Sequence, residues 1–332
     1  MKRITALILC IVMTACVICS CSGGEADSNE VRVAYFPNIT HAQALYMKDQ
    51  GTFEAAVGDE YSVSWTAFNA GPAEVEALFA GEIDLGYIGP VPAINANVKS
   101  HGDVVIIANA CDAGAVLLKS AASDIDSVAD LDGKKVSVPQ LGNTQHLSLL
   151  DLLAANGLKP VSEGGTVDIV EVENADVQTM FDNGSINAAI VPEPWGSILE
   201  NKCGAGIVLD YDEIMAGGNY PTSVVVVRKD FMEANPEIVE AFIKAHLDAT
   251  EYINAQTDEA IDIICRQIEE ATGKTYEASV IDRAFSRLNI TADISGDALD
   301  EFAEIGVAQG FVATAPDKGY VDIQILKSLE QR

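Results

Sequence analysis

The sequence predicts an α/β fold of two similar lobes, in which strands alternate with helices. The first indication is a near-repeat, because LFAGEIDLGYIGP at 78–90 is echoed by MFDNGSINAAIVP at 180–192. In each copy a helix leads through a Gly-containing turn into a short apolar strand that stops at Gly or Pro. The second indication is the Val-rich run at 222–227, which is typical of a buried strand. Two similar α/β units of this kind imply two lobes.

The elements of the first predicted lobe alternate regularly. Strands are expected at 31–36, 61–68, 85–88 and 104–110, and helices at 41–50, 72–80 and 91–100. A strict alternation of strands and helices favours a mostly parallel sheet that is covered by helices.

A second set of elements follows and then gives way to helices. Strands are expected at 136–139, 167–172, 188–191 and 206–209, and helices at 144–155, 177–183 and 195–201. The strand at 222–227 returns to the first lobe, and helices at 236–254, 258–272, 276–287 and 298–309 should cover that lobe. The predicted division is therefore 31–118 plus 222–332 for lobe 1 and 119–221 for lobe 2, with two chain crossings as a hinge and a cleft between the lobes.

The first 21 residues have the pattern of an export signal. Lys2 and Arg3 supply a positive start, and the apolar run at 4–18 is short for a membrane span. The run ends before Cys21, which we expect to be lipidated because the surrounding residues resemble a bacterial lipobox. Cys16 is the alternative, and an ordinary signal peptide is a third reading. The small and polar residues 22–30 are expected to form a tether.

Composition restricts the possible partners. The formal charge of −30, from 50 acidic and 20 basic residues, argues against a surface that binds nucleic acid or anionic membranes. Only Cys111, Cys203 and Cys265 lie outside the predicted signal, so disulfides are not the basis of the fold. Arginine is absent between Arg32 and Arg228, so an anion bound by this region must be held by backbone amides and neutral side chains.

Five junctions between a strand and the next helix carry unusual residues. In parallel sheets such junctions face the ligand cleft, and the first N–H groups of each helix lack an intrahelical partner there. Plain N-capping is the simpler reading of any one junction, but all five are expected to converge on one cleft. The junctions are Pro37–His41, Asn69–Pro72, Gly89–Pro92, Gln140–Gln145 and Pro192–Trp195.

The junctions offer recognition groups and no evident catalytic set. Gly142, Asn143 and Thr144 combine close backbone approach with donors for an anionic head group. Trp195 could cover the apolar part of a ligand or could be a core aromatic. A zinc site from His41, His146 and Glu193 is conceivable but lacks ligand spacing, so no metal or cofactor is predicted. No nucleophile motif occurs in the expected context, so an enzyme is not expected.

Several strings resemble one known family. They are YFPNITHA at 35–42, FNAGP at 68–72, AGEIDLGYIGP at 80–90, PQLGNT at 139–144, VPEPW at 191–195 and AFSRL at 284–288. They are similar to the substrate-binding lipoproteins of ABC importers for aliphatic sulfonates, nitrate and taurine. The resemblance covers essentially the whole chain that follows the predicted signal.

The resemblance implies a type II periplasmic-binding-protein fold that closes on a small ligand and delivers it to an ABC permease with its ATPase. It also implies a receptor held by its lipid at the outer face of the cell membrane. The expected ligand is an aliphatic sulfonate, with nitrate, taurine, bicarbonate or a pyrimidine vitamin precursor as alternatives. A ligand sensor is a further alternative, and an enzyme like the pyrimidine synthases is disfavoured because their Cys-rich signature is missing. The expected ligand-binding residues are Asn38, Thr40, His41, Asn69, Gly71, Gly89, Gly142, Asn143, Thr144, Glu193 and Trp195.

Overall fold

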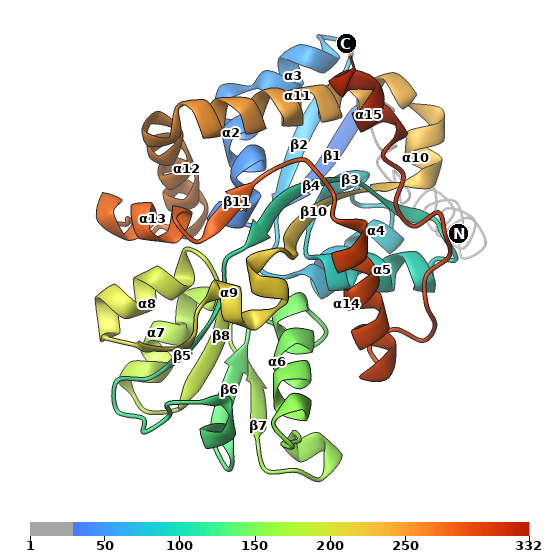
Figure 1. Cartoon of the computed structure of the whole chain (residues 1–332). Helices are drawn as coiled ribbons and strands as arrows, with labels where there is room; N and C mark the ends of the chain where they lie inside the picture. Colours follow the sequence, from blue (N-terminus) through green and yellow to red (C-terminus); the bar gives the residue numbers. More distant parts are fainter. Residues whose placement is uncertain (1–28, 332) are drawn as a thin grey trace, which may run out of the picture. The chain divides into compact units, whose positions relative to one another are not determined.

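The computed structural model describes residues 29–331, which form two β-sheets flanked by helices (Figure 1). The chain divides into two units, Met1–Glu30 and Val31–Arg332, and the second unit carries almost the whole of both sheets. The predicted signal with Cys16 and Cys21, and the predicted tether up to residue 28, lie outside the described residues.

The first sheet has six strands in the order β11-β4-β10-β3-β1-β2. Strand β1 pairs in parallel with β3, whereas β10 lies antiparallel between β3 and β4. Strand β11 adds an antiparallel edge next to β4. The strands are β1 (Glu30–Tyr35), β2 (Ser62–Ala67), β3 (Leu85–Ile88), β4 (Val104–Ala113), β10 (Pro221–Arg228) and β11 (Leu288–Ile290).

The second sheet has five strands in the order β7-β6-β8-β5-β9. Strand β6 pairs in parallel with β7 and β8, and β5 lies antiparallel between β8 and β9. The strands are β5 (Ala115–Lys119), β6 (Lys135–Val138), β7 (Asp168–Glu171), β8 (Ala188–Pro192) and β9 (Gly206–Leu209).

Both sheets are mixed, whereas the sequence predicted mostly parallel pairing. The difference arises at the strands next to the chain crossings: β4 continues directly into β5, and β10 returns after β9 to lie against β4 and β3 (Figure 1). Gly114 makes the first crossing with a φ of 81°. This left-handed backbone conformation favours glycine, and a Cβ there would also lie 2.1 Å from Leu288 Cδ2.

Helices flank both sheets. Helix α6 coincides with the predicted helix at 144–155, and helix α11 packs on α2, α3 and α12. The α-helices are α2 (Ala42–Gln50), α3 (Thr52–Val57), α4 (Gly71–Phe79), α5 (Pro90–Lys99), α6 (Thr144–Ala155), α7 (Val177–Asp182), α8 (Trp195–Cys203), α9 (Tyr211–Ile214), α10 (Lys229–Ala234), α11 (Pro236–Ala255), α12 (Thr257–Thr272), α13 (Ala278–Phe285), α14 (Gly296–Ala308) and α15 (Gln324–Glu330). The 3-10 helices are η1 (Ile39–His41), η2 (Val128–Leu131), η3 (Val161–Glu163), η4 (Asn174–Asp176) and η5 (Ala216–Gly218).

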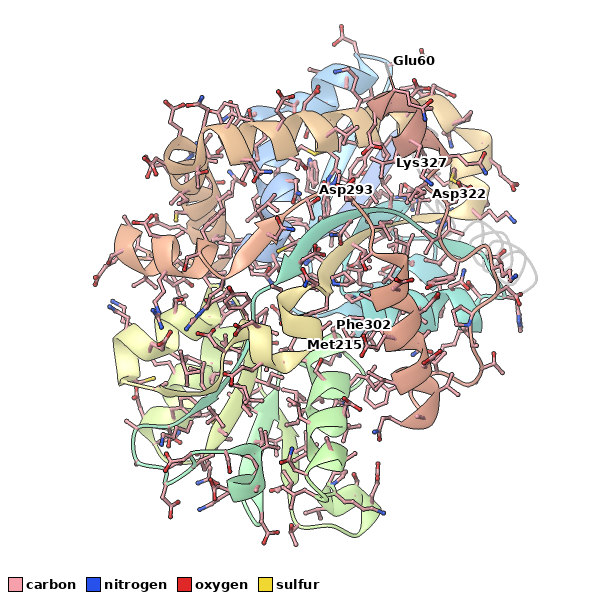
Figure 2. All side chains as sticks on the ribbon, in the orientation of Figure 1. Glu60, Met215, Asp293, Phe302, Asp322 and Lys327 are labelled. Atoms are coloured by element: carbon pink, nitrogen blue, oxygen red, sulfur yellow. The ribbon has the colours of Figure 1, made fainter. Side chains whose placement is uncertain are left out.

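The C-terminal helices do more than cover the first sheet, which is a correction to the sequence-based expectation. Helix α13 packs on α8, which follows β8 of the second sheet, and α14 packs on both α5 and α6. Phe302 of α14 and Met215 at the start of η5, labelled in Figure 2, join one apolar cluster. The chain therefore spans both sheets with its helices as well as with its two strand crossings.

Candidate functional site

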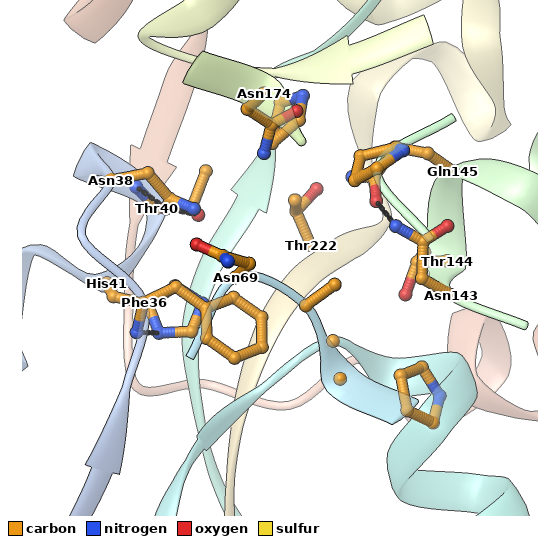
Figure 3. Close-up of a pocket in the computed structure, with 16 residues that line it drawn as sticks. Phe36, Asn38, Thr40, His41, Asn69, Asn143, Thr144, Gln145, Asn174 and Thr222 are labelled. Carbon is orange, nitrogen blue, oxygen red and sulfur yellow. Dashed lines mark hydrogen bonds between the residues drawn. The ribbon is translucent and has the colours of Figure 1, made fainter. Parts of the chain in front are cut away.

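A cavity lies where the ends of strands from both sheets meet the starts of the following helices (Figure 3). Its volume is about 30 Å³. Segments after β1, β2 and β3 line one side, and segments after β6 and β7 line the other. The lining residues are Phe36, Asn38, Thr40, His41, Asn69, Ala70, Gly71, Gly89, Pro92, Pro139, Asn143, Thr144, Gln145, Asn174, Pro192 and Thr222.

Two asparagines shape the cavity by capping helices. Asn38 Oδ1 accepts hydrogen bonds from the N–H and the hydroxyl of Thr40 at the start of η1. Asn143 Oδ1 accepts from the N–H of His146 at 2.8 Å at the start of α6, and Asn143 Nδ2 donates to Gln145 Oε1 at 3.0 Å. Both side-chain oxygens therefore act as N-caps, as the simpler interpretation of these junctions predicted. Each amide group has two N–H donors, so it can still offer hydrogens to a ligand.

His41 is a neutral hydrogen-bond donor. Its ring stacks on Phe36 with 4.4 Å between the ring centroids, and burial lowers the pKa of the imidazole to about 3. The N–H of Phe36 donates to His41 Nδ1 at 3.1 Å, so the single proton of the neutral ring resides on Nε2. This arrangement offers an Nε2–H donor without adding positive charge.

The two sides of the cleft touch at Thr144. The N–H of Val91, in the first turn of α5, donates to Thr144 Oγ1 at 3.4 Å. A Cβ added to Gly89 would lie 2.5 Å from the same hydroxyl oxygen, and a Cβ on Gly142 would lie 3.6 Å from Pro72 Cγ. Glycine at 89 therefore permits the close approach of α5 and α6, which follow strands of different sheets.

The cavity is polar but carries no formal charge. Among the described residues that line it there is no Asp, Glu, Lys or Arg, and its one titratable side chain is neutral His41. Hydrogen-bonding capacity comes from Asn, Gln and Thr side chains and from the helix starts. Such a site can bind a compact anion through donors, with the positive ends of helix dipoles in support.

Glu193 does not line this cavity, in contrast to the sequence-based expectation. Its side chain is fully buried, and its carboxylate accepts hydrogen bonds at 3.0 Å from both the N–H and the hydroxyl of Ser197. Arg287 Nη1 lies 2.6 Å from Glu193 Oε1. The carboxylate is committed to this internal network, and only the preceding Pro192 reaches the cavity wall.

Trp195 and Gly142 also lie outside the lining. Trp195 is buried against Tyr276 and borders a different cavity. Gly142 has a φ of 89° in the turn before α6, where its N–H donates to His146 Nδ1 at 3.0 Å. Its role is to shape the turn that presents Asn143 and Thr144. The remaining eight expected residues are brought together: Asn38, Thr40, His41, Asn69, Gly71, Gly89, Asn143 and Thr144.

Sequence reasoning did not single out several lining residues. Phe36, Gln145 and Pro192 occur inside strings that were noticed for their neighbours, so a signal was present. Thr222 lies in β10, which was read only as a buried strand, and Asn174 begins the short 3-10 helix η4. Neither of these two has a local pattern that distinguishes it from an ordinary strand or turn residue.

Within residues 29–331, no group of three or more His, Cys, Asp or Glu side chains is placed to hold a metal ion. None of the helices in this part of the chain has the length and apolar character needed to cross a membrane. Cys111, Cys203 and Cys265 are free thiols.

Two α/β lobes with a polar cavity between them define the class of periplasmic-binding-protein folds. The structure of the alkanesulfonate-binding protein SsuA from Xanthomonas axonopodis pv. citri, bound to MOPS, is similar with a TM-score of 0.74 at 20% identity. That likeness covers 90% of this chain and 99% of the other. The predicted fold class is thereby confirmed.

The chain belongs to the NMT1-like family, whose sequence profile matches residues 24–268. The taurine-binding periplasmic protein of Escherichia coli K12 is 31% identical over 236 residues, which is 70% of this chain and 69% of that protein. A putative aliphatic sulfonates-binding protein of Bacillus subtilis 168 is 26% identical over 266 residues, 79% of this chain and 77% of the relative. The resemblance found in the sequence is confirmed by these relatives.

An enzyme is also among the relatives. The 4-amino-5-hydroxymethyl-2-methylpyrimidine phosphate synthase of Legionella pneumophila Philadelphia 1 is 25% identical over 245 residues, 71% of this chain and 74% of the enzyme. The relatives thus include binding proteins and an enzyme, and the more similar of them are binding proteins.

Proposed function

We propose that this protein is an extracytoplasmic receptor that binds a small organic sulfonate between its two lobes for an ABC importer. The observation that carries the proposal is a cavity of neutral donors at helix starts from both sheets. A sulfonate spreads one negative charge over three oxygens, so it needs several donors more than it needs a counter-charge. The first N–H groups of α4 and α6, the amide groups and His41 Nε2–H can supply them.

The ligand's other end is expected to be uncharged. No described lining residue is a carboxylate that could pair with an ammonium group, because Glu193 is bound to Arg287. This favours an alkanesulfonate over an aminosulfonate such as taurine. The names of the taurine- and sulfonate-binding relatives support the sulfonate head group itself. Taurine, nitrate, bicarbonate and a pyrimidine vitamin precursor are the alternative ligands.

The proposed role is binding without catalysis. His41 is the one titratable side chain among the described lining residues, and a pKa of about 3 makes it a poor base near neutral pH. Ligand release to a permease with its ATPase follows from the receptor role. A sensor that leaves uptake unaffected is the alternative, and loss of growth on ethanesulfonate as sulfur source after deletion of the gene would argue against it.

Calorimetric titration of the purified full chain tests the binding proposal. Ethanesulfonate should bind at least about tenfold more tightly than taurine, because an ammonium group lacks a partner in the cavity. Thr144→Val should weaken ethanesulfonate binding severalfold without changing the melting temperature of the free protein. Binding of nitrate, bicarbonate or a pyrimidine alone would keep the receptor and replace its ligand, and absence of binding throughout would contradict the proposal.

We also propose that the chain is anchored through a lipid on Cys21. The support is the apolar run followed by Cys and small residues in the sequence. Cys21→Ala should move the protein from the membrane fraction to the soluble fraction on cell fractionation. Unchanged anchoring of Cys21→Ala would point to Cys16, and release of wild-type protein would point to an ordinary signal peptide.

A further inference from the structure

A second cavity lies beside the cleft and is larger than the first. Its volume is about 270 Å³. One wall comes from η4, α7 and α8, which follow strands of the second sheet, and the other comes from the turn between α12 and α13. The cavity therefore lies between the second lobe and a segment that is covalently attached to the helices of the first.

Asn174 lines both cavities, so this side chain lies at the boundary between them. Figure 3 shows it at the edge of the cleft cavity, away from the labelled residues of α6. Its Oδ1 is buried and has no hydrogen-bond partner among the described residues. A buried amide oxygen without a partner is unfavourable, and no hydrogen bond through this oxygen holds the Asn174 side chain in place.

The walls of the second cavity suit an aromatic or aliphatic body. Trp195 and Tyr276 meet edge to face with 6.1 Å between ring centroids, and Ile198 and Leu199 extend the apolar surface. The Tyr276 hydroxyl is also buried without a hydrogen bond of normal geometry, although Thr272 lies near it. The cavity thus offers mainly apolar surface to the body of a ligand.

The charge at this cavity disfavours a cationic ligand end. Lys274 Nζ lies 6.0 Å from the Trp195 ring centroid and donates to the carbonyl of Ala175. Lys202 also lines the cavity, with Glu277 3.4 Å from its ammonium group. A neutral or anionic body is compatible with the two lysines, whereas Lys274 would repel an ammonium group.

We propose that the cavity walled by Trp195 and Tyr276 receives the organic body of the ligand while its sulfonate occupies the cleft cavity. This inference rests on the proposed function. The cleft cavity has room for a compact head group, and the second cavity adds about 270 Å³ beyond Asn174. The preferred substrates are therefore sulfonates with an uncharged aromatic or bulky tail, and a tail that reaches the second cavity requires the Asn174 side chain at their boundary to turn aside.

The test compares methanesulfonate, which is a head group alone, with benzenesulfonate by calorimetric titration of the full chain. Wild-type protein should bind benzenesulfonate at least about tenfold more tightly than methanesulfonate. Tyr276→Ala removes a wall, and Ala175→Phe fills the cavity from a half-buried position. Both variants should lose most of the preference for benzenesulfonate while methanesulfonate affinity stays within about twofold. Tyr252→Ala, in α11, is the matched control and should change neither affinity.

Each other outcome has a defined meaning. Unchanged benzenesulfonate binding in both variants would overturn the inference, and so would an equal loss for the two ligands, because that would indicate a general effect on the fold. Failure of wild-type protein to bind either sulfonate would overturn the proposed function itself. Tight methanesulfonate binding without a preference for benzenesulfonate would leave the proposed function in place and remove the second cavity from it.

Discussion

The carboxylate of Glu74 is buried in an unusual environment. It lies in the first turn of α4, its side chain is fully buried, and neither carboxylate oxygen accepts a hydrogen bond from the described residues. Burial raises the pKa of Glu74 well above its usual value. The folded state therefore holds this proton to higher pH than the unfolded state does, and stability falls as the pH rises above the unfolded pKa.

Glu74→Gln should therefore stabilise the protein most at high pH. We expect the free energy of unfolding at pH 8 to rise by about 1 kcal/mol or more, with the gain shrinking towards pH 4.5, where the unfolded carboxyl also becomes protonated. Urea denaturation at both pH values measures this effect. Glu76→Gln, at an exposed position of the same helix, is the control and should change little. A gain that does not depend on pH would contradict the account.

At the scale of elements, the segment from α12 to β11 ties the second lobe to the first sheet. It leaves α12, packs α13 on α8, and returns as β11 to pair with β4 (Figure 1). Arg287 fixes this segment, because its guanidinium lies within 2.6 Å of Glu193 and 2.9 Å of both Glu200 and Asp210. Glu193 directly follows Pro192 of the cleft cavity, so the network positions one wall of the candidate site.

Removing Arg287 should be far more costly than removing its neighbour Arg283. Arg287→Ala leaves buried Glu193 without its counter-charge, so we expect a loss of about 3–5 kcal/mol in the free energy of unfolding. Arg283 pairs with Glu200 at 2.8 Å but has a side chain that is 50% exposed, so Arg283→Ala should cost less than about 1 kcal/mol. Denaturant titrations of both variants give the comparison. Similar small losses would show that the Arg287 network contributes little.

The same elements show what the sequence could and could not predict. Helices such as α6 and the strand β9 match their predicted ranges because periodicity is a local property. The three-residue strand β11 and the antiparallel direction of β10 were not predicted, since both depend on tertiary pairing. The sequence also placed Glu193 in the cleft. Spacing in the sequence does not reveal the tertiary pairing with Arg287 that holds this carboxylate away from the cavity.

Over the whole described chain, two lobes approach each other around a small cavity. The helix starts that line it could be predicted from the order of strands and helices, since strand ends converge at one sheet edge. The contact between Gly89 and Thr144 could not, because it joins segments that follow strands of different sheets. That contact now provides a way to block closure without disturbing either lobe.

Calorimetric titration of ethanesulfonate into wild-type protein and Gly89→Ala tests whether the ligand is held by closure of the two lobes. Gly89 has a φ of −66°, which alanine adopts freely, so the free variant should be as stable as wild type or slightly more stable. Its Cβ would lie 2.5 Å from Thr144 Oγ1 when the lobes are in contact. We predict that wild type binds and that Gly89→Ala binds at least about tenfold more weakly at unchanged melting temperature. Equal affinity in the two proteins would contradict a ligand held by closure of the two lobes.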